Sequence, residues 1–433
     1  MLTETADTTA GSYFVSNYPP YDFWSPRYAA DVFAMLDRPP VPDTPLGIYL
    51  HIPFCRKRCH FCYFKVYTDK NADEIESYLD AAVQEMTLYS QKPVIGGRKP
   101  KFIYFGGGTP SYISSRQLTS LVERMKALLP WDEAEEVAFE CEPGTLTEPK
   151  LQVIRDLGVT RLSLGIENFD DEILKVNGRA HTSKEIEPCY RFARHIGFPQ
   201  INIDLISGMV GETDDNWRAC VRKTIALDPD SVTIYQMEVP YNTDLFKEMK
   251  VMGQTVAPVA SWKTKRDWVS YAFLELEKAG YTVRSAYTAV KNPERTKFLY
   301  TDLLWHGADM LGLGVASFSH VQGVHFQNEH EYGPYCEKLK EGTLPIYRAL
   351  PLTQEQRAIR ELVLQMKLGH VETPYFRDKF GIEVQERFAA PLRKLREQGF
   401  VSTGADNLRL SREGLMQVDR LLEEFFLPEH RAA

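Results

Sequence analysis

The stretch "LGIYLHIPFCRKRCHFC", residues 46–62, joins a run of apolar and β-branched residues to a loop that carries three cysteines. The run at 46–52 has the length and composition of a buried strand. Cys55, Cys59 and Cys62 follow directly, so we expect the three thiols at the carboxyl end of that strand. Five further segments of the same kind come after it.

Strands and helices alternate along this part of the chain. Six strand–helix units in series predict a parallel sheet with crossover helices, curved or closed into a partial (β/α)6 barrel. Functional groups in such folds gather at the carboxyl ends of the strands. The further strands are predicted at 101–107, 135–141, 161–167, 201–207 and 231–237, and the helices at 72–90, 115–129, 147–157, 183–195 and 213–226.

The chain divides into four predicted parts. Residues 1–45 are a lead-in rich in Tyr, Phe, Trp and Pro with one short helix near 27–36, and residues 46–290 form the α/β core. Residues 291–350 extend the barrel, and residues 351–433 form a helical domain whose order of elements resembles a winged helix. Its 13 basic and 13 acidic side chains lack the basic excess of a DNA-binding wing. We therefore expect a packing domain that covers the barrel.

Composition limits the classes of partner. A net charge of −8 and a pI near 5.8 argue against a general affinity for nucleic acid or anionic membranes. No apolar run approaches the ~20 residues that a membrane span needs, and the first residues do not resemble a secretory signal. Seven cysteines are an odd number and are widely spread, which is typical of a reducing compartment. We expect a cytoplasmic monomer with no nucleic-acid partner and no membrane span.

Three clustered thiols are compatible with several kinds of site. Thiolates are soft ligands that suit zinc or an iron–sulfur cluster. A cubane cluster held through three of its irons leaves the fourth iron open to another ligand. The spacing alone leaves two alternatives, which are a zinc site completed by His51 or His60 and a thiol redox loop.

The neighbouring motifs favour the cluster. The pattern C-x3-C-x2-C, with an aromatic residue before the last cysteine, is the signature of radical S-adenosylmethionine enzymes. The chain further resembles the oxygen-independent coproporphyrinogen III oxidase family, and this match covers nearly its whole length. It is carried by "YLHIPFCRKRCHFCYF" (49–64), "FGGGTPSYI" (105–113), "ECEPGTL" (140–146), "GVTRLSLGIENFDDEILKVNGRAH" (158–181) and "NIDLISGM" (202–209).

The resemblance implies a 4Fe–4S cluster and two molecules of S-adenosylmethionine, one of which is cleaved to a 5′-deoxyadenosyl radical. It also implies a role for each residue that matches a family motif. The implied cluster ligands are Cys55, Cys59 and Cys62; the implied contacts to the first S-adenosylmethionine are Tyr49, Gly107 and Glu140; those to the second are Phe61, Gly108, Thr109, Arg179 and Asp204; and Glu167 and Met237 end strands that face the same site.

Two departures from the family pattern bear on the reaction. The decarboxylating oxidases place another cysteine two residues after the third cluster ligand, where this chain has Phe64, and they carry Gln where it has Glu167. A carboxylate near a sulfonium can tighten binding or act as a base, so we assign catalytic roles to Glu167 and Asp204. The alternative for Glu167 is a structural ion pair with Arg161 or Arg179.

These departures favour a particular branch of the family's chemistry. We expect transfer of a methyl or methylene unit from the second S-adenosylmethionine to an sp2 carbon of a small planar substrate, by methylation or cyclopropanation. Oxidative decarboxylation of coproporphyrinogen III and a haem chaperone without turnover are the alternatives. The expected macromolecular partner is an electron donor such as flavodoxin or ferredoxin.

Overall fold

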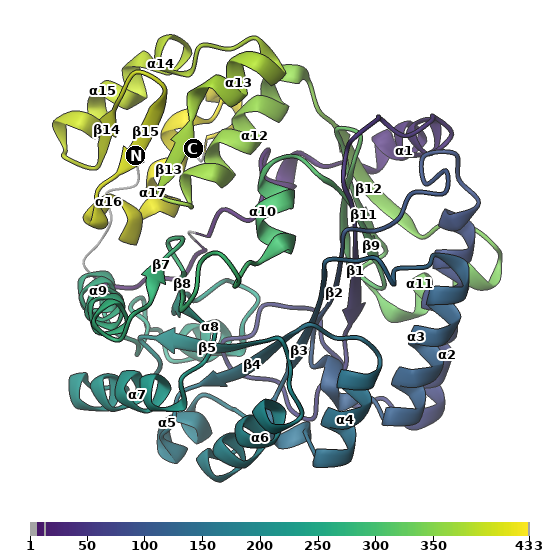
Figure 1. The fold of residues 1–433 in the computed structure, drawn as a ribbon, viewed down its shortest axis with the longest axis horizontal. Coiled ribbons are helices and arrows are strands. Elements are labelled where there is room, and N and C mark those ends of the chain that lie inside the picture. The colour runs from purple at the N-terminus through teal and green to yellow at the C-terminus, as the bar shows by residue number, and fades with distance from the viewer. Residues whose placement is uncertain (1–6, 13, 432–433) are drawn as a thin grey trace.

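The computed structural model describes residues 7–12 and 14–431. Its centre is a curved sheet with helices on the outer face (Figure 1). Six neighbouring strands are parallel and follow one another in chain order, which confirms the predicted partial barrel. They are β1 (Leu46–Ile52), β2 (Phe102–Gly107), β3 (Glu136–Cys141), β4 (Arg161–Glu167), β5 (Gln200–Ser207) and β6 (Ser231–Gln236).

The crossover helices lie where the periodicity predicts them, because polar caps mark their starts. Asn71 forms a capping box with Glu74 at the first of them, and the Thr213 side chain accepts a hydrogen bond from a backbone N–H at the last. The short helix α5 was not predicted. The helices are α2 (Ala72–Ser90), α3 (Ser115–Leu128), α4 (Glu148–Asp156), α5 (Asp171–Val176), α6 (Ser183–His195) and α7 (Asp214–Leu227).

The sheet continues beyond the six expected strands, to twelve in all. β9 (Asp309–Leu313) pairs parallel with β1, and β10 (Phe318–Val321), β11 (Val324–Asn328) and β12 (Ile346–Pro351) follow it antiparallel. At the other edge, β8 and β7 pair antiparallel beside β6. The remaining elements of this part are β7 (Thr282–Val283), β8 (Thr288–Val290), α8 (Asp244–Val251), α9 (Trp262–Lys278), α10 (Leu299–Trp305) and α11 (Tyr332–Lys340).

The lead-in crosses the open side of the curved sheet. Gly11 pairs with Val239, just after β6, and Ser25 pairs with Ala349 of β12. The expected helix follows as α1 (Ala29–Leu36). The described residues between Gly11 and Ser25 therefore run from the end of β6 to β12 at the sheet's edge.

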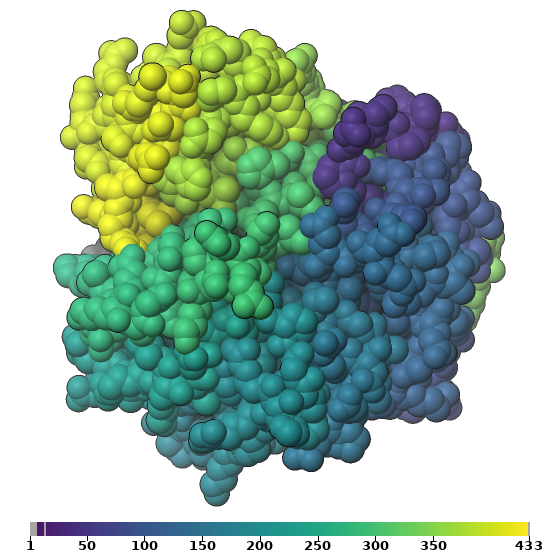
Figure 2. All heavy atoms as spheres, in the orientation of Figure 1, coloured from purple at the N-terminus to yellow at the C-terminus, as the bar shows by residue number. Residues whose placement is uncertain are grey.

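The C-terminal domain packs against the end of β6, where the Gln236 side chain donates to the Met416 carbonyl (Figures 1 and 2). Its small sheet has the order β13–β15–β14. Among the described helices, none is both long and apolar enough to cross a membrane. The domain contains α12 (Gln354–Met366), β13 (His370–Glu372), α13 (Thr373–Phe380), α14 (Val384–Arg387), α15 (Ala389–Glu397), β14 (Val401–Thr403), β15 (Asn407–Leu410), α16 (Arg412–Met416) and α17 (Val418–Leu422).

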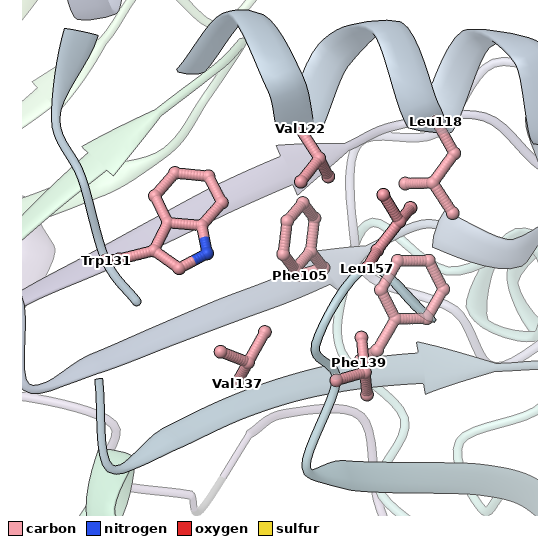
Figure 3. A pocket seen from close by; sticks show the side chains of 8 residues that line it. Phe105, Leu118, Val122, Trp131, Val137, Phe139 and Leu157 are labelled. Carbon is pink, nitrogen blue, oxygen red and sulfur yellow. The ribbon is translucent and has the colours of Figure 1, made fainter. Parts of the chain in front are cut away.

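The two faces of the parallel sheet differ in packing. On the outer face, Phe105, Val137 and Phe139 meet Leu118 and Val122 of α3 around a small apolar void (Figure 3). The inner face instead carries accessible residues on all six strands, while most other residues of these strands are buried. We call the space along this face the chamber. Its partly accessible residues include Tyr49, Tyr104, Glu140, Gly165 and Asp204, and Tyr235 is exposed.

Candidate active site

The cysteine loop leaves β1 at the rim of the chamber. The Thr109 hydroxyl donates to the Cys55 sulfur at 3.3 Å, and the Arg179 guanidinium lies 3.4 Å from the Cys59 sulfur. Burial, with a smaller contribution from the neighbouring thiols, raises the pKa of Cys55 to about 12 and that of Cys62 to about 11. The three thiols thus lie close together in a largely desolvated loop.

The donor set fits a cubane cluster better than a single ion. Within the described part of the chain, no three His, Cys, Asp or Glu side chains converge closely enough to hold one metal ion. A cubane does not require such convergence, because each thiolate binds a different iron. His51 has other partners at both ring nitrogens, the Tyr49 hydroxyl at 3.1 Å and the Lys65 carbonyl at 3.5 Å. His60 packs its ring against Gly178.

The glycine turn at the end of β2 forms backbone hydrogen bonds with the start of the cysteine loop. The Gly108 N–H donates to the Ile52 carbonyl at 2.8 Å, and the Thr109 N–H donates to the Phe54 carbonyl at 2.9 Å. Gly107 has a φ of +111°, which a residue with a side chain rarely adopts. The turn and the loop therefore form one backbone unit.

Replacing Gly108 by alanine should disturb this unit. A Cβ atom there would lie 2.8 Å from the Ile52 carbonyl oxygen and 2.9 Å from the Pro53 carbonyl carbon, and backbone atoms cannot move aside easily. We expect Gly108→Ala to lower the free energy of unfolding by about 2 kcal/mol and to reduce iron loading. Urea unfolding and iron analysis test this. Gly333→Ala is the control, because no atom lies within 4 Å of its added Cβ; equal behaviour of the two variants would contradict the prediction.

Glu140 is held on the inner face of β3. The Tyr104 hydroxyl donates to it at 2.5 Å, and the Gly107 N–H donates to its other oxygen at 3.1 Å. Burial raises the pKa of Glu140 to about 7. The Tyr49 ring stacks on Tyr104 with centroids 5.8 Å apart, so Tyr104 of β2 contacts both Tyr49 of β1 and Glu140 of β3.

Glu167 reaches the chamber through a local irregularity in β4. The register with β5 shifts between Gly165 and Glu167, and Glu167 has a φ of +65°, which is costly for a residue with a side chain. Its carboxylate lies 3.6 Å from Arg179, so of the two structural partners considered, Arg179 is the one observed. Burial raises the pKa of Glu167 to about 7, although Arg179 opposes the shift.

Asp204 completes a set of three carboxyl groups. It accepts hydrogen bonds at 2.8 Å from the Ser163 hydroxyl and from the Asn202 amide. Burial raises its pKa, and its charge in turn contributes to the raised pKa of both Glu140 and Glu167. The three groups are therefore near neighbours on the inner faces of β3, β4 and β5.

Two predicted residues lie at the side of this arrangement. Phe61 packs against a small apolar cluster that includes Met237 and Ile206. Met237 is buried, and its carbonyl accepts a hydrogen bond from Lys265. The structure thus places them in apolar packing beside the loop, and a cofactor contact for either stays a prediction.

Of the aromatic side chains that lie together here, the sequence predicted Tyr49 but neither Tyr104 nor Tyr300. Tyr104 lies 4.5 Å, centroid to centroid, from Tyr300 of α10. The alternation of inner and outer residues along β2 would have identified Tyr104, because that position shares the inner face with Tyr49 of β1. No local signal points to Tyr300, since it reaches the chamber from a helix nearly 200 residues later in the chain.

Comparisons with known proteins identify two domains along the chain. The radical SAM superfamily matches residues 49–223, and the HemN C-terminal domain matches residues 352–416. Coproporphyrinogen III oxidase, anaerobic 1, from Cereibacter sphaeroides is 27% identical over 96% of this chain and 94% of its own length. The haem chaperone HemW from Bacillus subtilis is 27% identical over 84% of this chain and 95% of its own length.

A solved structure shares the fold. Coproporphyrinogen III oxidase (HemN) from Escherichia coli superimposes with a TM-score of 0.81 at 22% identity, over 95% of this chain and 96% of that one. The chain is an enzyme with a radical S-adenosylmethionine superfamily domain followed by a HemN C-terminal domain, and it is similar over most of its length to oxygen-independent coproporphyrinogen III oxidases and to the haem chaperone HemW.

Proposed function

We propose that this enzyme uses two molecules of S-adenosylmethionine and transfers one carbon from the second to an sp2 carbon of a small aromatic or heterocyclic substrate. The observation that carries the proposal is the set of carboxyl groups in the chamber. Glu140 alone is enough for the amine of one S-adenosylmethionine. Glu167 and Asp204 provide additional negative charge beside it.

Electrostatics explains why a second sulfonium suits this position. Three neighbouring carboxyl groups that are removed from water disfavour one another's ionisation. A bound sulfonium would offset that repulsion, and in a site of low effective dielectric the attraction is stronger than in water. The carboxyl groups and the cation would therefore stabilise each other.

When bound, the cluster would supply one electron to the first S-adenosylmethionine, whose cleavage gives methionine and a 5′-deoxyadenosyl radical, and this radical would take a hydrogen atom from the methyl group of the second. The chain's own residues orient the reactants. Tyr104 and the Gly107 N–H fix the Glu140 carboxylate, and Arg179 fixes Glu167.

The walls of the chamber suit a planar substrate. Tyr235 remains 43% exposed and Tyr63 46% exposed, although Tyr235 lies on the inner face of β6 and Tyr63 follows the last cluster cysteine. Aromatic rings with open faces provide stacking surfaces for an aromatic ligand. Tyr49 and Tyr104 add a stacked pair on the neighbouring strands.

The oxidase alternative is favoured by the relative from Cereibacter sphaeroides, which matches almost end to end. Two observations weigh against it. Coproporphyrinogen III is a tetracarboxylate, and the carboxyl groups of Glu140, Glu167 and Asp204 would repel such a substrate. Phe64 also stands where the decarboxylating oxidases have a further cysteine.

Methyl-deuterated S-adenosylmethionine distinguishes the candidates. Anaerobic incubation of the reconstituted enzyme with dithionite should give 5′-deoxyadenosine that contains one deuterium, because the radical takes its hydrogen atom from the labelled methyl group. Mass spectrometry measures this before any substrate is known. Unlabelled 5′-deoxyadenosine together with loss of carbon dioxide from added coproporphyrinogen III would support the oxidase. Haem binding without any 5′-deoxyadenosine would support the chaperone.

A further inference from the structure

The surface beside the cysteine loop is formed partly by the segment that follows β6. The Leu245 N–H at the start of α8 donates to the His60 carbonyl at 2.9 Å, and the Asn242 amide donates to the Tyr63 carbonyl at 2.7 Å. Arg58 of the loop donates to the Asn242 carbonyl at 3.3 Å. Residues 241–256 are therefore attached directly to the loop that holds the three thiols.

This surface carries a positive excess on a molecule that is acidic overall. Three consecutive basic residues, Arg56 to Arg58, lie between the first two cysteines, whereas Lys247 and Lys250 of α8 are matched in number by Asp244 and Glu248 of the same helix. Lys57 and Lys250 are exposed, and neither forms an ion pair with any residue in the described ranges. The net charge of the whole chain is −8, so the positive charge here is local.

The same segment exposes large apolar side chains. Val251 is 88% exposed, Met252 69%, Tyr241 67% and Val256 44%. Four of the twelve large exposed apolar residues identified in the structure thus fall within sixteen consecutive positions. A concentration of this kind beside charged groups is typical of a surface that contacts another protein.

The position of this surface suits electron delivery. α8 rises ~1.5 Å per residue, so Val251 lies roughly 9 Å along the helix from Leu245, which contacts the loop. The open side of the chamber is crossed by the lead-in, and the β6 edge is covered by the C-terminal domain. The cysteine loop is therefore the part of the site that a large partner reaches most directly.

We propose that Arg56 to Arg58 together with residues 241–256 form the docking surface for a small acidic protein that carries one electron at low potential. One electron passes from the reduced flavin or iron–sulfur centre of that carrier to the cluster, and the carrier leaves oxidised by one electron. Weak electron-transfer complexes bury less than about 1,200 Å² and depend on electrostatic steering, which matches a compact patch with basic and apolar parts. The inference requires the cluster, but it does not depend on which carbon the enzyme transfers.

The rate of cluster reduction tests the proposal. In the reconstituted enzyme, stopped-flow absorbance under anaerobic conditions follows reduction by flavodoxin hydroquinone at low and at high salt. We expect the double variant Lys57→Glu/Lys250→Glu to react about tenfold more slowly at low salt and to lose the salt dependence of the wild type. Reduction by dithionite and the electron paramagnetic resonance spectrum of the reduced cluster should stay unchanged.

Two further variants separate docking from other effects. Val251→Ser/Met252→Ser should also slow reduction by flavodoxin without any change of charge. The control variant Arg222→Glu/Lys340→Glu alters residues on α7 and α11, away from the proposed docking surface. It changes the net charge by the same amount as Lys57→Glu/Lys250→Glu, and flavodoxin should reduce it at the wild-type rate. Slowing by this control, or no slowing by either docking variant, would overturn the proposal.

A membrane surface is the competing explanation for basic and apolar side chains together. Sedimentation with vesicles that contain phosphatidylglycerol measures it in the same preparations. Vesicle binding that Val251→Ser/Met252→Ser abolishes, with an unchanged rate of reduction by flavodoxin, would assign the patch to lipid and reject the carrier. A normal rate of reduction by flavodoxin, combined with unlabelled 5′-deoxyadenosine from methyl-deuterated S-adenosylmethionine, would instead reject only the one-carbon transfer.

Discussion

Cys59→Ala should reduce the iron retained after anaerobic reconstitution to less than about a tenth of the wild-type value and should abolish 5′-deoxyadenosine formation. Two thiolates cannot hold a cubane through three irons, and no described His, Asp or Glu joins the loop cysteines in a metal-binding group. Cys59 is also the thiol that Arg179 contacts at 3.4 Å, so its loss removes an anchor for the Arg179–Glu167 pair. Iron and sulfide analysis with the visible absorption spectrum measures the effect.

Cys189→Ala is the matched control for this loss. Cys189 is a buried thiol on α6, outside the loop, whose sulfur contacts the carbonyl of Ile186 in its own helix. We expect this variant to retain full iron and normal turnover. A wild-type protein that binds one zinc ion and shows no 4Fe–4S absorption would contradict the prediction and the cluster assignment with it.

Asp204→Asn should lower the rate of deuterium transfer into 5′-deoxyadenosine by on the order of 100-fold, the scale typical for removal of one positioned electrostatic group. The amide keeps the shape and can keep hydrogen bonds with Ser163 and Asn202, so the fold should persist. The negative charge beside the second sulfonium is lost. Anaerobic turnover with methyl-deuterated S-adenosylmethionine measures the effect.

The decisive comparison for Asp204→Asn is between two products of the same reaction. Cluster content and formation of unlabelled 5′-deoxyadenosine should survive, because the first S-adenosylmethionine does not depend on Asp204. Asp80→Asn, on the exposed side of α2, removes a carboxylate outside the chamber and should leave both products unchanged. Equal loss of labelled and unlabelled 5′-deoxyadenosine in Asp204→Asn would show that the carboxylate serves the first cofactor instead.

The parallel core could be predicted from the sequence because its signals are local. Apolar strand runs are separated by helices with polar caps, and both kinds of segment were placed to within one or two residues. The strands β9 to β12 lacked such signals. They are short, β10 and β11 contain His, Ser, Gln and Asn, and β9 pairs with β1, more than 250 residues earlier in the chain. Long-range pairing of this kind has no local periodicity.

The residues of the candidate site likewise divide into those that local motifs predict and those that only long-range contacts place. The three cysteines, the glycine turn and the strand-end carboxylates follow from motifs that lie within single loops or strands. Arg179 contacts Cys59, which lies 120 positions earlier in the chain, and it also pairs with Glu167, which follows the register shift in β4. A backbone irregularity of one residue is not visible in apolar periodicity, so this ion pair could be named as a possibility but not placed.

The lead-in has a consequence for how the protein is made. Its described partners are formed late in synthesis: Gly11 pairs with Val239, Ser25 with Ala349, and the Val15 N–H donates to Asp419. Gly11 can pair only after some 230 further residues have been made, Ser25 only after some 320, and Val15 only after some 400. The contacts of the lead-in therefore form in an order set by the chain, first with the end of β6, then with β12 and last with the C-terminal domain. While the chain is being made, this segment cannot yet join β6 to β12.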